Sequence, residues 1–369
     1  MLKWKGRPLP TCACCAEPLA SPPTGAAVSR RQLLGAGAAM GFVAAGLAPK
    51  ALAQPAAPAK PHRIDVHCHI VPPTWFAAME IIGRIDFPLK NWSVPKLIED
   101  MDKGGVATSM TSPTTPQVTP LGKETAVRIA RESNEYAKKL MVDHPGRFGV
   151  WATLPLPHID ESLKEIAYAF DTLKVDGVGC MTSYGDKWLG DPMFAPVWEE
   201  LNRRKATVYT HPTSPNCCVN LVRGVPDYVV EFGADTTRTI ASLILSGTSQ
   251  KYKDINWIWS HGGGALMAFA ERFQWQIVNT PPYRGKFTLD AMNAELRRFY
   301  YDTAAISGAV TLHALNELVT SSQIVFGTDF PYRTAADHAR GVTAFFKGDD
   351  LKKVDRENAL KLVPRLRNA

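Results

Sequence analysis

The stretch Asp65-Val66-His67-Cys68-His69 is the most informative indication of the fold, because it places two imidazoles two residues apart on a predicted buried β-strand. Successive side chains of a strand point to opposite faces, so His67 and His69 should face the same way. Two neutral imidazoles that converge at a strand end form half of a divalent metal site, provided that later strands supply the other ligands. Without such ligands, two histidines at this spacing would indicate ordinary hydrogen-bonded residues.

Three later segments end in a similar way. They are Val208-Tyr209-Thr210-His211-Pro212, Trp257-Ile258-Trp259-Ser260-His261-Gly262 and Val325-Phe326-Gly327-Thr328-Asp329. In each, a β-branched and aromatic run stops at a His or Asp, with Pro or Gly close behind. This pattern places each polar group at the carboxyl end of a strand, the rim where a (β/α)8 barrel gathers its catalytic residues.

The rhythm of the rest of the chain fits such a barrel. Helical patterns separate the strand candidates, and Lys123 to Asp143 shows the apolar stripe of an amphipathic helix. Eight strands are expected, near Ile64–Ile70, Ala107–Ser112, Phe148–Leu154, Gly177–Thr182, Thr207–His211, Asn256–His261, Phe299–Thr303 and Ile324–Thr328. Eight is the number that a closed parallel (β/α)8 TIM barrel requires, and a doubly wound open sheet is the alternative.

The N-terminal region predicts export rather than fold. Ser29-Arg30-Arg31-Gln32-Leu33-Leu34 opens a stretch rich in Ala, Gly and Leu, and Ala51-Leu52-Ala53 supplies small residues for cleavage. We expect a twin-arginine signal peptide over residues 1–53, a Pro/Ala linker over 54–60 and one catalytic domain over 61–369. The location would be the periplasm, without a stable membrane anchor, because the apolar run is short for a span.

The charge distribution argues against nucleic-acid binding. The chain of 369 residues carries a formal net charge of +7. Six basic residues and Glu17 give the segment through Ala53 a net +5, which leaves +2 for the other 316 residues. A domain so nearly neutral lacks the basic surface that nucleic-acid binding requires.

Four segments make the chain resemble the amidohydrolase-related superfamily, in the branch of aminocarboxymuconate semialdehyde decarboxylase. They are Ile64 to Pro72, Ser260-His261-Gly262-Gly263-Gly264, Gly327-Thr328-Asp329-Phe330-Pro331 and Glu357-Asn358-Ala359-Leu360. In this order they cover nearly all of the chain after the linker. The combination is highly specific for the superfamily and much less so for the substrate.

The resemblance implies a mononuclear metal site. His67 and His69 match the strand-one ligands, His211 the strand-five ligand and Asp329 the strand-eight ligand. Zinc is the expected ion, with manganese as the alternative. His261 matches the histidine that serves as general base beside the metal, and Asp329 would share in the proton transfer. Binuclear relatives have a carboxylated lysine on strand four, whereas Gly177 to Ser183 holds none.

The resemblance also implies substrate contacts. Arg84 lies near the place of a substrate-binding arginine, although its spacing differs by a residue, and Arg272 matches an arginine contributed across a homodimer interface. Surface arginines are the alternative for both. Trp75 and Tyr332, in predicted strand-end loops, could line the mouth, or simply pack there. Asp302, on the seventh strand, is a further candidate pocket acid.

The function expected from these features is that of a metal-dependent carboxy-lyase acting on a small aromatic or unsaturated carboxylic acid. A metal-dependent hydrolase of an ester, lactone or carbon–carbon bond is the alternative, since the same residues serve both reactions. A binding protein that uses the metal only to capture a ligand is a third reading. His261 speaks against it, because holding zinc needs no fifth polar residue.

Overall fold

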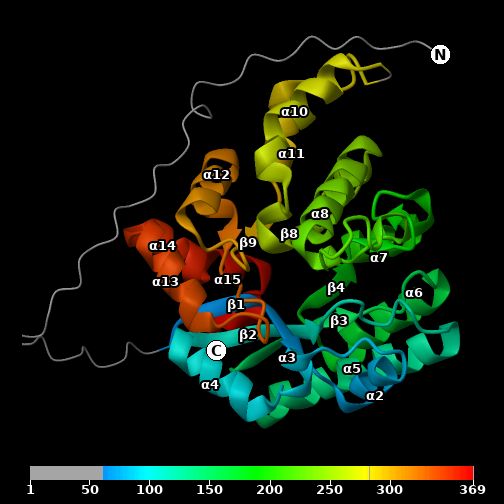
Figure 1. The fold of residues 1–369 in the computed structure, drawn as a ribbon, viewed down its shortest axis with the longest axis vertical. Helices are drawn as coiled ribbons and strands as arrows, with labels where there is room; N and C mark the ends of the chain where they lie inside the picture. Colours follow the sequence, from blue (N-terminus) through cyan, green and yellow to red (C-terminus); the bar gives the residue numbers. More distant parts are fainter. Residues whose placement is uncertain (1–60, 282, 369) are drawn as a thin grey trace, which may run out of the picture. The chain divides into compact units, whose positions relative to one another are not determined.

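In a computed structural model, the described residues 61–281 and 283–368 form a barrel of eight parallel strands surrounded by helices (Figure 1). The strands follow one another around the sheet in chain order, apart from a small antiparallel hairpin of β5 (Ser183–Tyr184) and β6 (Lys187–Trp188). The barrel strands are β1 (Arg63–Ile70), β2 (Val106–Pro113), β3 (Phe148–Thr153), β4 (Gly177–Met181), β7 (Thr207–His211), β8 (Asn256–Trp259), β9 (Tyr300–Asp302) and β10 (Ile324–Val325).

The segment after β10 closes the ring. Val66 N–H donates to Phe326 O at 2.9 Å, and His69 N–H donates to Phe330 O at 2.8 Å, so this segment runs beside β1. The predicted (β/α)8 barrel is therefore confirmed. A doubly wound sheet would instead reverse its strand order in the middle and leave both edges open.

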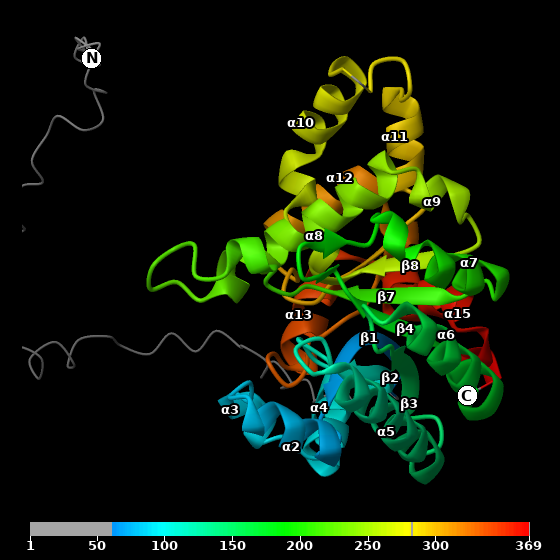
Figure 2. The same cartoon turned by 90° about the vertical axis from the view of Figure 1, so that its right-hand side faces the viewer.

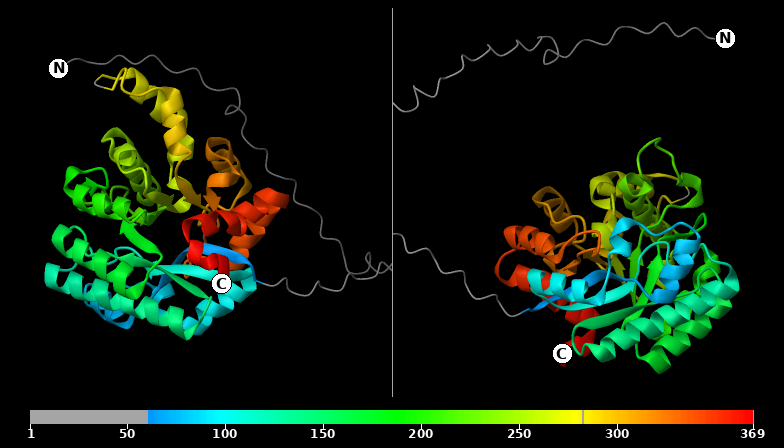
Figure 3. Two further views of the ribbon diagram at one scale, coloured as in Figure 1. Left: turned by 180° about the vertical axis from the view of Figure 1, so that it is seen from behind. Right: turned by 60° about the horizontal axis from the view of Figure 1, so that its bottom comes forward.

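Helices connect the strands and cover their outer side (Figures 1 and 3). The helices are α2 (Pro73–Ile81), α3 (Phe87–Lys90), α4 (Val94–Gly104), α5 (Lys123–Asp143), α6 (Ile159–Tyr168), α7 (Ala195–Arg203), α8 (Asp227–Leu245), α9 (Thr248–Lys251), α10 (Leu266–Asn279), α11 (Leu289–Leu296), α12 (Ala309–Val319), α13 (Ala335–Phe345), α14 (Gly348–Lys352) and α15 (Asn358–Leu362). Short 3₁₀ and π turns extend several of them.

Local sequence explains where these helices begin and end. The Ser93 hydroxyl accepts the Lys96 N–H at the start of α4, and Gly105 ends the helix in the left-handed conformation, at φ 67°. In α5 the predicted stripe of Ala126, Ile129, Ala130 and Ser133 is buried. Helix α8 begins at Asp227, nine residues before the predicted Thr236, so its first turns were missed.

Apolar side chains from six strands fill the interior of the barrel, beneath the carboxyl ends of the strands. Ile64, Met110, Trp151, Tyr209 and Val325 belong to one buried cluster that also includes residues of α15. The rings of Trp151 and Tyr209 are stacked, with 6.2 Å between their centroids. The barrel is thus a packed core and not a pore, and polar chemistry is confined to its rim.

The predicted signal peptide (1–53) and linker (54–60) lie outside the described residues, so the domain boundaries and the export route stay predictions. Among the helices that the structure describes, none has the length and apolar character needed to cross a membrane.

Candidate metal centre

Four side chains from three places in the sequence meet at the carboxyl ends of the strands. His67 and His69 come from β1, His211 ends β7, and Asp329 follows β10. The two Nε2 atoms of His67 and His69 lie 3.2 Å apart, and Asp329 Oδ1 lies 3.2 Å and 3.1 Å from them. One nitrogen or oxygen of each of the four residues lies within 4.8 Å of the others. The structure thus brings together all four predicted metal ligands.

The far side of each ring has a hydrogen-bond acceptor. The Nδ1 of His67 faces Asp302 Oδ2 at 2.8 Å, that of His69 faces the Ser112 carbonyl at 3.4 Å, and that of His211 faces the Pro212 carbonyl at 2.9 Å. A carbonyl oxygen accepts a hydrogen bond and cannot donate one, so Nδ1 must carry the hydrogen in His69 and His211. Their Nε2 lone pairs then point toward the shared centre.

The electrostatics of the four groups fit a bound cation. Burial lowers the pKa of His69, and it lowers the pKa of His211 well below its usual value, so both rings are neutral at pH 7. Although burial opposes ionisation of Asp329, the neighbouring His67, His261 and His69 hold its pKa well below the ordinary value. Buried lone pairs and a carboxylate facing one another repel unless a positive charge lies between them.

The spacing fits as well. In a tetrahedron with metal–ligand bonds of about 2.0 to 2.1 Å, neighbouring ligand atoms are about 3.3 Å apart. The separations of 3.1 to 3.2 Å among the His67, His69 and Asp329 atoms are close to that value, and the His211 nitrogen lies within 4.8 Å of the others. Three histidine nitrogens and one carboxylate oxygen are ligand types that a divalent metal such as zinc binds.

The buried carboxylate of Asp65 holds the segment after β10 that carries Asp329. Asp65 Oδ1 accepts the backbone N–H of His67 at 2.9 Å and of Thr328 at 3.1 Å, and its Oδ2 accepts the Thr328 hydroxyl at 2.7 Å. Burial raises the pKa of Asp65 to about 7. The carboxylate thereby joins β1 to the segment after β10, so the ligands of both are held in register.

His261 lies beside the ligand group rather than within it. Its Nε2 is 3.3 Å from Asp329 Oδ2, the oxygen that does not contact His67 or His69. The residue is in the left-handed region at φ 51°, at the start of a turn that continues through Gly264. A Cβ on Gly264 would lie 2.3 Å from the Gly233 carbonyl oxygen, so the glycine is required for this close approach.

Two aromatic rings lie beside the ligand group, each in contact with a different histidine. The Tyr332 ring meets His69 edge-on at 6.1 Å between centroids, and the Phe232 ring of α8 meets His211 in the same way at 6.1 Å. Tyr332 is 37% exposed, so its ring is accessible from solvent. Sequence reasoning missed Phe232, because the predicted helix began after it. The four-residue spacing of Tyr228 and Phe232, whose rings touch, was the available signal.

Comparison with known proteins places the chain in a family. A family model described as amidohydrolase matches residues 64–365. The chain belongs to the amidohydrolase family. Its relatives include a 6-methylsalicylic acid decarboxylase of Aspergillus aculeatus, 33% identical over 325 residues, which cover 83% of this chain and 97% of the relative.

Two further proteins extend the comparison of this amidohydrolase. A 2-amino-3-carboxymuconate-6-semialdehyde decarboxylase of Dictyostelium discoideum is 22% identical over 306 residues, 73% of this chain and 82% of the relative. Dihydroxybenzoic acid decarboxylase of a Polaromonas species, solved with manganese and the inhibitor 2-nitroresorcinol, superposes with a TM-score of 0.73 at 21% identity, covering 83% and 98% of the two chains. The predicted superfamily and branch are confirmed.

Other predicted residues of this amidohydrolase lie elsewhere. Trp75 belongs to α2 and not to a loop; it is completely buried, and its indole N–H donates to Gln117 O at 2.8 Å. Packing against the apolar cluster that includes Met79 and Leu89 explains this position. Asp302 is also completely buried, so it is not an acid lining an open pocket.

The two predicted arginines are not part of the ligand group. Arg84 follows α2, and Arg272 lies in α10, which projects with α11 beyond the barrel strands in Figures 1 and 2. Both side chains are exposed, and within residues 61–281 and 283–368 neither forms an ion pair. Directly after β4, near the place that the lysine of binuclear relatives would occupy, the hydroxyls of Thr182 and Ser183 donate to Asp235.

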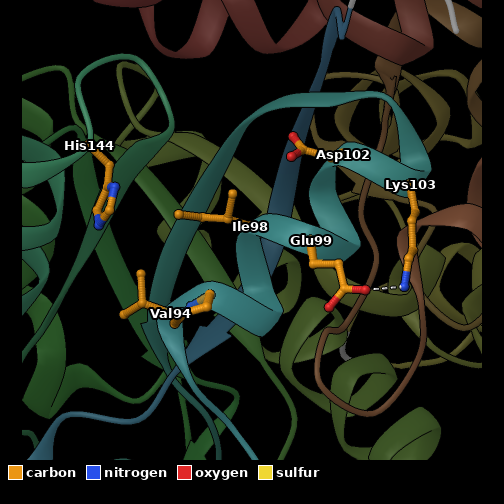
Figure 4. Close-up of a pocket in the computed structure, with 7 residues that line it drawn as sticks. Val94, Ile98, Glu99, Asp102, Lys103 and His144 are labelled. Carbon is orange, nitrogen blue, oxygen red and sulfur yellow. Dashed lines mark hydrogen bonds and ion pairs between the residues drawn. The ribbon is translucent and has the colours of Figure 1, made fainter.

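A shallow groove on the outside of the barrel has no part in this chemistry. It runs along α4, where Glu99 and Lys103 form an ion pair at 2.6 Å (Figure 4). Its lining is Val94, Pro95, Ile98, Glu99, Asp102, Lys103 and His144, which includes none of the four ligands. The candidate site of the enzyme is therefore the cluster at the strand ends.

Proposed function

We propose that this amidohydrolase is a metal-dependent, non-oxidative decarboxylase of a small aromatic acid with a hydroxyl group next to the carboxylate. The observation that carries the proposal is the geometry around Asp329, whose Oδ1 faces two histidine nitrogens while its Oδ2 faces His261. The acids acted on by the decarboxylases similar to this chain support the choice of substrate class.

His67, His69, His211 and Asp329 would hold one ion. Three histidine nitrogens and one carboxylate oxygen favour Zn²⁺, with Mn²⁺ as the alternative because a neighbour of the same fold was solved with it. Such an ion would bind oxygens of the substrate carboxylate and hydroxyl, and would stabilise negative charge on them.

His261 and Asp329 would manage the proton. His261, hydrogen-bonded at Nε2 to Asp329 Oδ2, delivers a proton to the ring carbon that bears the carboxylate. The electrons of the bond between that carbon and the carboxylate then return to the ring as CO2 leaves. Overall, one carboxylate and one proton give the arene and CO2, without water being consumed.

The rim would position the flat substrate. Phe232 and Tyr332 border two different ligands and can stack against an aromatic ring. Arg84 would contribute positive charge at the entrance, and Arg272 would do so in the neighbouring subunit of a homodimer. Exposed Phe269 and Trp275 on the same helix as Arg272 support an interface there. Processing after Ala53 and location in the periplasm complete the proposal.

The test incubates the protein with 6-methylsalicylate that carries ¹³C in its carboxyl group and measures where the ¹³C goes. We expect ¹³CO2 release and, in D2O, one deuterium on the ring carbon that lost it. His261→Asn should retain the metal but lose activity about 10²- to 10⁴-fold. His313→Asn, an exposed histidine of α12, is the matched control and should remain active. Water-consuming cleavage of esters or lactones without CO2 release from a panel of hydroxybenzoates would contradict the proposal.

A further inference from the structure

Asp302 is a buried carboxylate that contacts both halves of the site without being one of the four predicted ligands. It ends β9, it is 0% exposed, and both of its oxygens accept hydrogen bonds. Oδ2 lies 2.8 Å from His67 Nδ1, and Oδ1 accepts the backbone N–H of His261 at 2.8 Å and of Ala304 at 3.0 Å.

The bond to His67 determines which ring nitrogen can bind a metal. Because the carboxylate accepts a hydrogen bond from Nδ1–H, Nε2 is the nitrogen that can offer a lone pair to a metal beside His69 and Asp329. The approach is close: a Cβ on Gly327 would lie 3.0 Å from the Cβ atoms of both Asp302 and His67. Gly327 therefore leaves the room in which the ring and the carboxylate meet.

The bond to His261 holds the residue proposed to move the proton. His261 is a non-glycine residue at φ 51° and ψ 42°, a backbone conformation that side chains other than Gly, Asn and Asp seldom adopt. Its N–H is anchored to Asp302, and its carbonyl accepts the Gly264 N–H at 3.0 Å. The orientation of the His261 ring toward Asp329 depends on this anchored turn.

We propose that Asp302 is a positioning residue that sets the metal ligand His67 and the proton-transfer residue His261 together, from one carboxylate. This inference rests on the metal site of the proposed function. A carboxylate is required because it accepts at both oxygens, whereas an amide accepts at one and donates at the other. If Asn keeps its oxygen on the two backbone N–H groups, its NH2 faces His67 and forces the ring to move its proton to Nε2.

The experiment compares Asp302→Asn with Asp235→Asn. Asp235 is an equally buried carboxylate, which accepts hydrogen bonds from Thr182, Ser183 and Trp188 instead of from the site. We expect Asp302→Asn to weaken Zn²⁺ binding about 10- to 100-fold in chelator competition. At saturating Zn²⁺, Asp302→Asn should recover kcat because its oxygen still accepts the His261 N–H, whereas Asp302→Ala lacks that acceptor and should keep a lowered kcat with KM unchanged. Asp235→Asn should bind Zn²⁺ like the parent protein.

A second readout needs no activity. Histidine ¹⁵N NMR of the metal-free parent protein, with the His67 signal assigned by a His67→Gln variant, should show a hydrogen on Nδ1 of His67, and Asp302→Asn should leave a hydrogen on Nε2 alone. Unchanged Zn²⁺ affinity and an unchanged His67 signal in Asp302→Asn would overturn the inference. If that variant does not fold, a His67 ring without a hydrogen on Nδ1 in the parent protein overturns it. A parent protein that positions His67 as described but releases no CO2 would contradict only the proposed function.

Discussion

The ligand group and the rim above it are built in different ways. His67, His69 and His211 lie on strands, and their places follow from backbone pairing around a closed barrel. Tyr332 follows the last strand in a loop, and Phe232 and Arg272 lie on helices outside the sheet. On the proposed function, the barrel would therefore determine the chemistry at the centre, and the connecting segments would determine which substrate fits. Mutations should therefore have larger effects at the centre than at the rim.

The largest effect is expected from removing a central ligand. His211→Ala takes one nitrogen from the group and leaves a gap between Phe232 and His67. We expect metal affinity to fall by more than the roughly 100-fold that loss of a supporting contact costs, with activity lost in parallel. Plasma mass spectrometry of the purified variant measures this, with His313→Asn as the control. Full metal content in His211→Ala would show that His211 is not a ligand.

The next effect concerns pH. Although burial opposes it, Asp302 and Asp329 raise the pKa of His67 to about 10 in the metal-free protein. A raised pKa stabilises the metal-free fold fully below about pH 6.5, the unfolded value, and this contribution is lost as pH rises toward 10. A metal must displace the same proton, so its affinity should rise about tenfold per pH unit over this range.

Calorimetry in two buffers with different ionisation enthalpies measures the protons released. We expect about one proton per metal ion at pH 7. Denaturant unfolding of the metal-free protein at pH 7 and pH 9 checks the opposite trend in stability. Metal affinity that does not change with pH would contradict the protonation state assigned to His67.

At the rim, smaller changes are expected from the aromatic rings. Phe232→Ala and Tyr332→Ala each remove one face against which an aromatic acid can stack. Such contacts contribute about 0.5 to 1.5 kcal/mol, which corresponds to a rise in KM of about two- to twelvefold. Steady-state kinetics should show this rise with metal content unchanged. Loss of the metal from either variant would mean that the rim and the ligand group are not separable.

The smallest effects are expected from the arginines. Arg84 and Arg272 are exposed, where solvent weakens charge interactions to about 1 kcal/mol or less. Arg84→Gln should therefore raise KM by no more than about fivefold. Arg272→Gln should act only where a second subunit is present, which the dependence of activity on protein concentration reveals. A loss as large as that of His261→Asn at either position would make the arginine part of the central site.

The sequence predicts the centre far better than the rim, for a physical reason. The β-branched and aromatic residues of Thr207–His211 predict a buried strand from local sequence alone. The place of His211 at the end of that strand therefore follows from the pattern. Trp75 was expected in a loop, yet it is a buried residue of the helix α2. The prediction was wrong because the local sequence after β1 did not distinguish a helical connection from an irregular one. Phe232 reaches His211 only through the packing of α8 against the barrel, which no local pattern contains.

Buried polar partners are a further limit. That Asp302 would bond both His67 and His261 depends on how β9 lies between its neighbours in space, and the sequence showed only an acid near a strand end. The twin-arginine signal and the linker, by contrast, are read from composition alone, and they stay predictions.

Removal and restoration of the metal distinguish a metal-dependent reaction from one that needs no ion. The protein is freed of metal with a chelator and assayed for CO2 release from 6-methylsalicylate while Zn²⁺ or Mn²⁺ is added back. We predict no CO2 release from the stripped protein and full recovery at one ion per chain. CO2 release that is equally fast without the metal, or recovery only at two ions per chain, would contradict the mononuclear site formed by His67, His69, His211 and Asp329.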